Sequence, residues 1–135
     1  MLGWILEAVN EAEWDPTHFW VDEHYPRTMM LTLVVYAYHK EFLTAGEIEK
    51  AVETDEVLRY VCCSRQPSAE VIRRFRRGHI EVIRVALATV LERALASDGP
   101  GEETPGDGLR SYAAFELADQ RIRSAMLMEM IALDV

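Results

Sequence analysis

The side chains best suited to binding chemistry are arginines gathered in one short stretch. Residues 71–84 read Val-Ile-Arg-Arg-Phe-Arg-Arg-Gly-His-Ile-Glu-Val-Ile-Arg, and seven of the fourteen basic residues of the chain lie between Arg59 and Arg84. That segment contains two acidic residues and so carries a net charge of +5, whereas the whole chain carries −9. A basic segment inside an acidic protein predicts one surface that faces anions, with nucleic acid as a candidate partner.

The periodicity of this segment places most of its arginines on one side of a helix. At 100° per residue, Arg73, Arg77 and Arg84 fall within about 40° of one another, opposite the apolar stripe that contains Phe75. A helix that is buried on one face and lined by arginines on the other has the geometry of a groove-binding helix. We therefore predict a nucleic-acid contact surface formed by Arg73, Arg74, Arg76, Arg77 and Arg84. Arg76 is a weaker candidate, because it lies nearer the buried stripe.

The same arginines have acidic neighbours. Glu70 lies four residues before Arg74, and Glu81 lies four residues after Arg77, a spacing that allows ion pairs within the helix. A solvated face that neutralises itself explains the pattern as well as phosphate contact does. The residues alone therefore leave both interpretations open.

Other reactive side chains give no pattern that predicts catalysis. Cys62 and Cys63 are adjacent, which disfavours a mutual disulfide and a paired metal site, so we expect two reduced thiols near the core. His18 and His24 flank Asp22 at a spacing that matches no familiar metal motif. No nucleophile–histidine spacing or glycine-rich phosphate loop stands out, and we predict no enzymatic activity, no metal and no cofactor.

Length and composition favour a single soluble domain. The chain has 135 residues, of which 50% are hydrophobic and 27% are charged, as in ordinary globular proteins. The apolar run from Met29 to Tyr38 is interrupted by Thr32 and is too short to span a membrane. Glu7, Glu11 and Glu13 make the N-terminus unlike a secretory signal. We expect no membrane contact and a cytoplasmic location.

The hydrophobic periodicity predicts an all-α, bundle-like domain of five to six helices. The second helix is apolar almost all round and should lie at the centre, in contact with the first, third and fifth. Thr44 and Glu47 match a capping box at the start of the third helix. The expected ranges are Met1 to about Trp14, Arg27 to Lys40, residues after Thr44, Asp55 to Cys62, Ala69 to Ala96 and Ser111 to Leu133.

Residues 97–108 contain four glycines and two prolines, which predicts a flexible linker. It would separate a helical domain, residues 1–96, from a C-terminal helical segment, residues 109–135, used for oligomerisation or docking. The end of that last helix is apolar on nearly every side and must be covered. We expect a second chain, rather than the surface of the first two helices, to cover it through Met126, Met130 and Leu133.

Three blocks carry a resemblance to a known family. Residues 25–38 read Tyr-Pro-Arg-Thr-Met-Met-Leu-Thr-Leu-Val-Val-Tyr-Ala-Tyr, and residues 46–62 begin Gly-Glu-Ile-Glu-Lys-Ala-Val-Glu. Residues 67–79 combine a proline, a few polar residues and the pattern Arg-Phe-Arg-Arg-x-His. Over about residues 20–96 the chain resembles the N-terminal helical domain of bacterial insertion-sequence transposases of the DDE class. The resemblance implies a domain that engages transposon-end DNA or assembles the transposase.

The chain departs from that family after residue 97, where nothing predicts the strands of its metal-dependent RNase H-like catalytic domain. Two functions from different classes therefore remain open. The first is a non-catalytic, transposase-derived DNA-binding or assembly domain that uses the arginine-lined helix. The second is an acidic helical module that binds proteins, as a homo-oligomer or with a helical partner, and does not contact DNA. The resemblance favours the first and the net charge of −9 favours the second.

Overall fold

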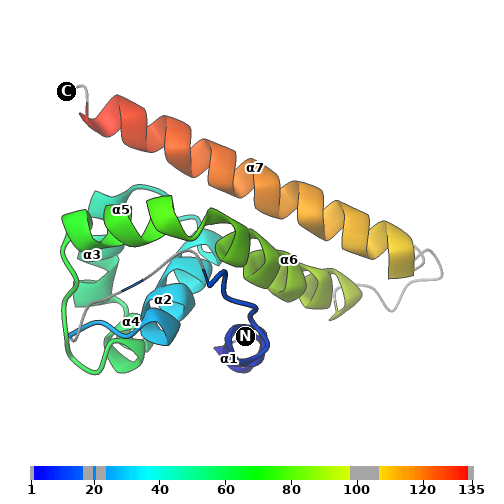
Figure 1. Ribbon diagram of the computed structural model, residues 1–135, viewed down its shortest axis with the longest axis horizontal. Coiled ribbons are helices and arrows are strands. Elements are labelled where there is room, and N and C mark those ends of the chain that lie inside the picture. Colours follow the sequence, from blue (N-terminus) through cyan, green and yellow to red (C-terminus); the bar gives the residue numbers. More distant parts are fainter. Residues whose placement is uncertain (1, 17–19, 21–23, 98–106, 134–135) are drawn as a thin grey trace.

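The fold is described from a computed structural model, which defines residues 2–16, 20, 24–97 and 107–133. Within these ranges the chain forms helices and no strands, so the predicted all-α class is confirmed. Figure 1 shows the shorter helices gathered below one long helix, α7, that crosses the top of the molecule. The helices are α1 (Leu2–Asn10), α2 (Arg27–His39), α3 (Ala45–Thr54), α4 (Glu56–Val61), α5 (Ala69–Gly78), α6 (Ile80–Ser97) and α7 (Asp107–Leu133).

Helix α2 forms the centre of the domain, as its apolar sequence predicts. Every residue from Met30 to Tyr38 is buried, and α1, α3, α4, α5 and α6 all pack against it. Because side chains on all sides of the helix are apolar, only a surrounding shell of helices removes them from water.

Local capping signals set the positions of the next helices. The Glu47 N–H donates to Thr44 Oγ1 at 3.1 Å and the Thr44 N–H donates to Glu47 Oε1 at 3.3 Å, which completes the predicted capping box. Asp55 ends α3 and caps α4, where its carboxylate accepts the N–H groups of Val57 and Leu58. These short-range bonds explain why the boundaries near them match the sequence pattern.

The predicted helix from Ala69 to Ala96 is wrong as one continuous element. It is divided into α5 and α6 at His79, whose backbone leaves helical geometry (φ −137°, ψ 33°). Gly78, a poor helix former, directly precedes the break. His79 is buried, and its ring stacks on Phe75 with 4.5 Å between ring centroids. Arg84 therefore belongs to a different helix from Arg73, and the continuous helical wheel that grouped them does not apply.

Two tryptophan side chains from the loop after α1 pack against this break in the helix. The first helix ends at Asn10 rather than near Trp14, and the Trp14 ring lies 5.7 Å from the ring of His79. Trp20 makes an edge contact with Phe75 at 5.2 Å. The loop after α1 thus returns to the core. His18 and Asp22 lie outside the described residues.

Helix α7 packs mainly along α6, and its Arg121 also donates to the carbonyl of Tyr38 at the end of α2. It buries Ala114, Ala118, Ile122 and Ala125 in the same core as α2 and α6. Residues 98–106 of the predicted linker lie outside the described residues, while Ser97 ends α6 and Asp107 begins α7. The division at residues 97–108 stays a prediction, but the packing makes α7 a part of the main core. None of the described helices combines the length and apolar character needed to cross a membrane.

Candidate functional site: the arginines of α5 and the end of α7

Arg76, which the sequence pattern places near the edge of the buried stripe, lies in the interior. It is 9% exposed, and its Nη1 donates to the carbonyl of Leu43 at 2.6 Å and to Tyr38 Oη at 3.2 Å. Burial raises the pKa of Tyr38, although the Arg76 charge acts in the opposite direction. The hydrogen bonds of Arg76 therefore connect α5 to the C-terminal end of α2, and Arg76 exposes little surface to a phosphate.

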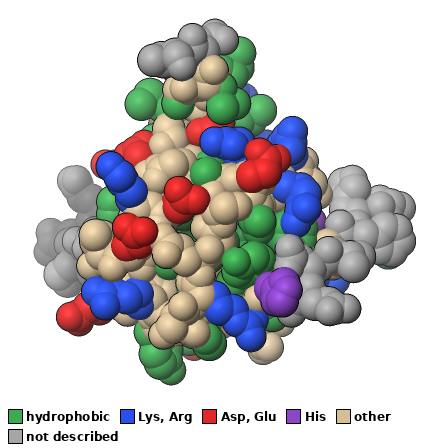
Figure 2. Space-filling model, turned by 90° about the vertical axis from the view of Figure 1, so that its left-hand side faces the viewer, with side chains coloured by type: hydrophobic (Ala, Val, Ile, Leu, Met, Phe, Trp, Pro, Cys, Tyr) green, Lys and Arg blue, Asp and Glu red, His purple; other side chains and the backbone are tan. Residues whose placement is uncertain are grey.

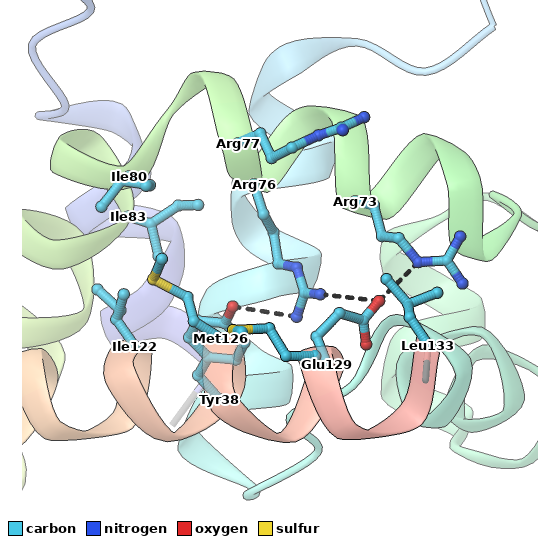
Figure 3. Close-up of a pocket in the computed structure, with 11 residues that line it drawn as sticks. Tyr38, Arg73, Arg76, Arg77, Ile80, Ile83, Ile122, Met126, Glu129 and Leu133 are labelled. Atoms are coloured by element: carbon cyan, nitrogen blue, oxygen red, sulfur yellow. Dashed lines mark hydrogen bonds and ion pairs between the residues drawn. The ribbon is translucent and has the colours of Figure 1, made fainter. Parts of the chain in front are cut away.

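One carboxylate, that of Glu129, pairs with both Arg73 and Arg76. Glu129 Oε1 accepts from Arg73 Nε at 2.6 Å and lies 3.4 Å from Arg76 Nη2. Glu129 Oε2 accepts the N–H of Ala45 at 3.1 Å, at the positive N-terminal end of α3. The hydrogen bond from Arg73 to Glu129 raises the pKa of that guanidinium above its usual value. Figure 3 shows Arg73 and Arg76 converging on Glu129 from α5, with α7 below them.

A second arginine–carboxylate contact joins α6 to α7. Arg84 Nε donates to Asp119 Oδ1 at 3.1 Å, and the same guanidinium pairs with Glu81 of its own helix. Both side chains of the Arg84–Asp119 pair are about four-fifths buried. The acidic partners of Arg73, Arg76 and Arg84 therefore come from α7 as well as from the local sequence.

The two remaining predicted contact residues lie on the outside of α5. The side chain of Arg77 is 73% exposed and lies 3.7 Å from Glu70, which also pairs with Arg73. Arg74 is exposed, and its guanidinium lies 5.0 Å from the ring centroid of Trp20. Figure 2 shows acidic and basic side chains interspersed on this end of the molecule rather than one continuous basic patch.

The end of α7 presents apolar side chains to solvent. Met126, Leu127, Met128, Met130, Ile131 and Leu133 are between 44% and 67% exposed. Glu129 is the exception among residues 126–133, because its side chain is 12% exposed. The predicted oligomerisation residues Met126, Met130 and Leu133 are therefore uncovered within one chain. Hydrophobic side chains gather around this end at the top of Figure 2.

A groove runs between the end of α7 and the junction of α5 with α6. Its volume is about 220 Å³. Met126, Met130 and Leu133 line one side, and Ile80 and Ile83 line the other. Arg73, Arg76 and Arg77 also line it. The structure thus brings three of the five predicted basic residues and the predicted oligomerisation residues to a single site, while Arg74 and Arg84 lie outside it.

The sequence pattern missed Glu129 as the partner of the arginines. A usable signal existed, because Glu129 is the only charged residue from Ser124 to Leu133. A single carboxylate in an apolar helix end must find a cation when that end packs on the domain. The pattern does not identify which cation it meets.

The cysteines and histidines do not assemble into a reactive centre in the described part of the chain. Cys62 is buried, Cys63 is exposed, and the two are not bridged. Burial raises the pKa of the Cys62 thiol to about 11, which opposes formation of the reactive thiolate. The described residues contain no group of three His, Cys, Asp or Glu side chains placed to hold a metal ion.

Comparison of the chain with protein-family models, curated proteins and solved structures gives no match. The resemblance of residues 20–96 to the transposase N-terminal domain therefore stays a prediction.

Proposed function

We propose that this chain is a non-catalytic helical interaction module that self-associates through the end of α7. One observation carries the proposal, which is a change of polarity along the outward face of that helix. Glu116, Gln120 and Arg123 occupy this face in the first part of α7 and are exposed. Leu127 and Ile131 continue the same face and are 59% and 56% exposed. An apolar patch at the end of an otherwise solvated face favours a contact surface.

The position of Leu127 and Ile131 separates them from the core of the domain. They lie four residues apart and therefore on one side of the helix. At 100° per residue, both lie on the side away from the buried Ala125. Rotation of α7 on α6 would cover these two side chains only by exposing Ala125, so we expect a second molecule to bury them.

A second copy of the chain fits this surface in charge. Two chains that each carry −9 repel one another at long range. From Ser124 to Leu133, however, the one charged residue is Glu129, and Arg73 and Arg76 neutralise it inside the domain. An uncharged apolar patch is complementary to itself and suits a twofold contact between identical subunits.

The acidic partners of the arginines support this proposal over the nucleic-acid alternative. Arg73, Arg76 and Arg84 are each paired with a carboxylate of α7, and these carboxylates compete with phosphate for the guanidinium groups. DNA binding remains a prediction that concerns chiefly the exposed Arg74 and Arg77. A titration with duplex DNA across salt concentrations tests it, since phosphate contacts weaken steeply as salt rises. Arg77→Glu should lower the affinity if that contact exists.

Sedimentation of a charge-substituted variant tests self-association. We expect the wild-type chain to associate reversibly with rising concentration and the double variant Leu127→Lys with Ile131→Lys to remain monomeric. A matched control replaces Leu6 and Val85 by lysine, because these are exposed apolar residues on α1 and α6. The control adds the same charge elsewhere and should associate like the wild type.

A wild-type chain that stays monomeric at high concentration contradicts the proposal. So does a double variant at residues 127 and 131 that associates as strongly as the control. Deletion of all of α7 is a poorer test, because the helix contributes Ala114, Ala118 and Ala125 to the core. The truncated chain would lose stability as well as the contact surface.

A further inference from the structure

The groove beside α7 combines an apolar interior with a basic rim. The side chains of Ile80, Ile83, Met126 and Met130 line its walls, and Arg77 lies at its edge. Figure 3 shows Met126 reaching between α6 and α7, and Arg77 extending along the outer side of α5. Leu127 and Ile131, which form the proposed self-association surface, do not line this groove. The two surfaces are therefore distinct, and binding in the groove does not depend on self-association.

The lining of the groove limits what it accepts. Its walls are mostly apolar and surround a volume of about 220 Å³; they are formed by Ile80, Ile83, Ile122, Met126, Met130 and Leu133. Burial of a charged group between such walls is costly. The walls therefore suit a hydrocarbon chain and disfavour a polyanion such as nucleic acid.

The positive charge of Arg77 beside the groove favours a ligand with an anionic group at one end. Arg77 is largely exposed, and its contact with Glu70 is long at 3.7 Å between two exposed side chains, so water screens that pair strongly. An incoming anion can replace Glu70 at low energetic cost. The neighbouring Arg73 and Arg76 already hold a carboxylate, that of Glu129, in place. Two guanidinium groups and the N–H of Ala45 thus already bind carboxylate oxygens beside the groove.

We propose that this groove binds a long-chain organic carboxylate. Its hydrocarbon chain lies between Ile80 and Met126, and its carboxylate pairs with Arg77 and Arg73. Glu129 is the intramolecular counterpart of that headgroup and competes with it for Arg73. The residues on either side of Glu129 at the end of α7 are exposed. The α7 wall of the groove, which carries Met126 and Met130, therefore loses few apolar contacts if it moves to admit a ligand.

Titration with decanoate, kept below the concentration at which it forms micelles, tests the proposal by calorimetry. The proton and carbon signals of the methionine methyl groups report the location of binding. We expect shifts at Met126 and Met130, but not at Met30, which is buried in α2. Decanol and decyltrimethylammonium have the same chain without the carboxylate and should bind at least tenfold more weakly.

Two variants separate the headgroup contact from simple adsorption to an apolar surface. Arg77→Gln should weaken decanoate binding about tenfold, whereas Arg59→Gln, at an exposed position on α4, should leave it unchanged. Glu129→Gln should strengthen binding, because it removes the internal competitor. Equal binding of decanol and decanoate, or equal effects of the two arginine variants, overturns the proposal. Because Arg77 is exposed, its variant remains informative even if Glu129→Gln impairs folding. Repeating the titration with the charge-substituted variant at residues 127 and 131 separates ligand binding from self-association.

Discussion

Replacement of Glu129 by alanine should destabilise the domain far more than a typical surface substitution. The change removes the carboxylate that pairs with Arg73 and Arg76 and accepts the N–H of Ala45. Arg76 loses most, because only 9% of it is exposed and water compensates a mostly buried charge less well than a paired carboxylate does. It keeps its hydrogen bonds to Tyr38 and Leu43, so its charge loses part of its compensation rather than all of it.

The expected magnitude can be worked from these contacts. Hydrogen bonds to charged groups contribute roughly 1.5–3 kcal/mol, and neutral ones about 1 kcal/mol. Arg73 is partly exposed and retains Glu70, so its loss is small. We expect a decrease of about 3 kcal/mol in the free energy of unfolding, at the lower end of the roughly 3–5 kcal/mol typical of a broken buried pair.

Urea unfolding followed by circular dichroism measures this change. Glu70→Ala is the matched control, because Glu70 also pairs with Arg73 but is 71% exposed, and we expect it to cost less than about 1 kcal/mol. In a double-mutant cycle with Arg76→Met, the double variant should lose less stability than the sum of the two single variants, because Glu129 and Arg76 stabilise each other. If Glu129→Ala costs no more than Glu70→Ala, the reasoning is refuted, and the end of α7 is not held by this carboxylate.

Three further predictions concern other parts of the molecule. Leu33→Asp should lower the free energy of unfolding by roughly 4 kcal/mol or more, because this side chain of α2 is completely buried and an unpaired charge there is costly. A loss below about 1 kcal/mol, measured by urea unfolding, would contradict the central position of α2. Asp119→Ala should lower the free energy of unfolding by about 1–2 kcal/mol, since Arg84 then loses a mostly buried partner. Unchanged midpoints of thermal and urea unfolding would contradict that contact. Burial raises the pKa of Cys62 from 9.0 to about 11, so the folded state favours the protonated thiol. The associated stability should be complete below about pH 9 and lost as pH rises toward about 11. A Cys62→Ala variant should lose less stability than wild type across that window, and at pH 8 an alkylating reagent should modify the exposed Cys63 first.

Much of the fold could be predicted because it depends on neighbours in sequence. Thr44 and Glu47 cap α3 across three residues, and Asp55 caps α4 in the same way. The apolar run in α2 requires burial on all sides, whatever covers it. Such signals act within one or two turns of helix, so reading the residues in order is enough to find them.

The break at His79 could not be predicted in this way. The apolar stripe continues through residues 71–91 with helical spacing, and a continuous helix satisfies it as well as two helices do. Ring packing decided between them, because Phe75, Trp14 and Trp20 surround the His79 ring. Two of those partners come from the loop after α1, more than fifty residues earlier in the chain.

The identity of the arginine partners depended on tertiary structure for the same reason. By itself the sequence determined that residues 71–84 carry a basic face and that residues 126–133 are apolar around one carboxylate. It placed them on separate surfaces with separate roles. Only the packing of α7 along α6 brought Glu129 to Arg73, across 56 positions in the chain. Helical periodicity determines which side chains share a face, whereas the ion pair that a charge forms depends on which helices pack together in space.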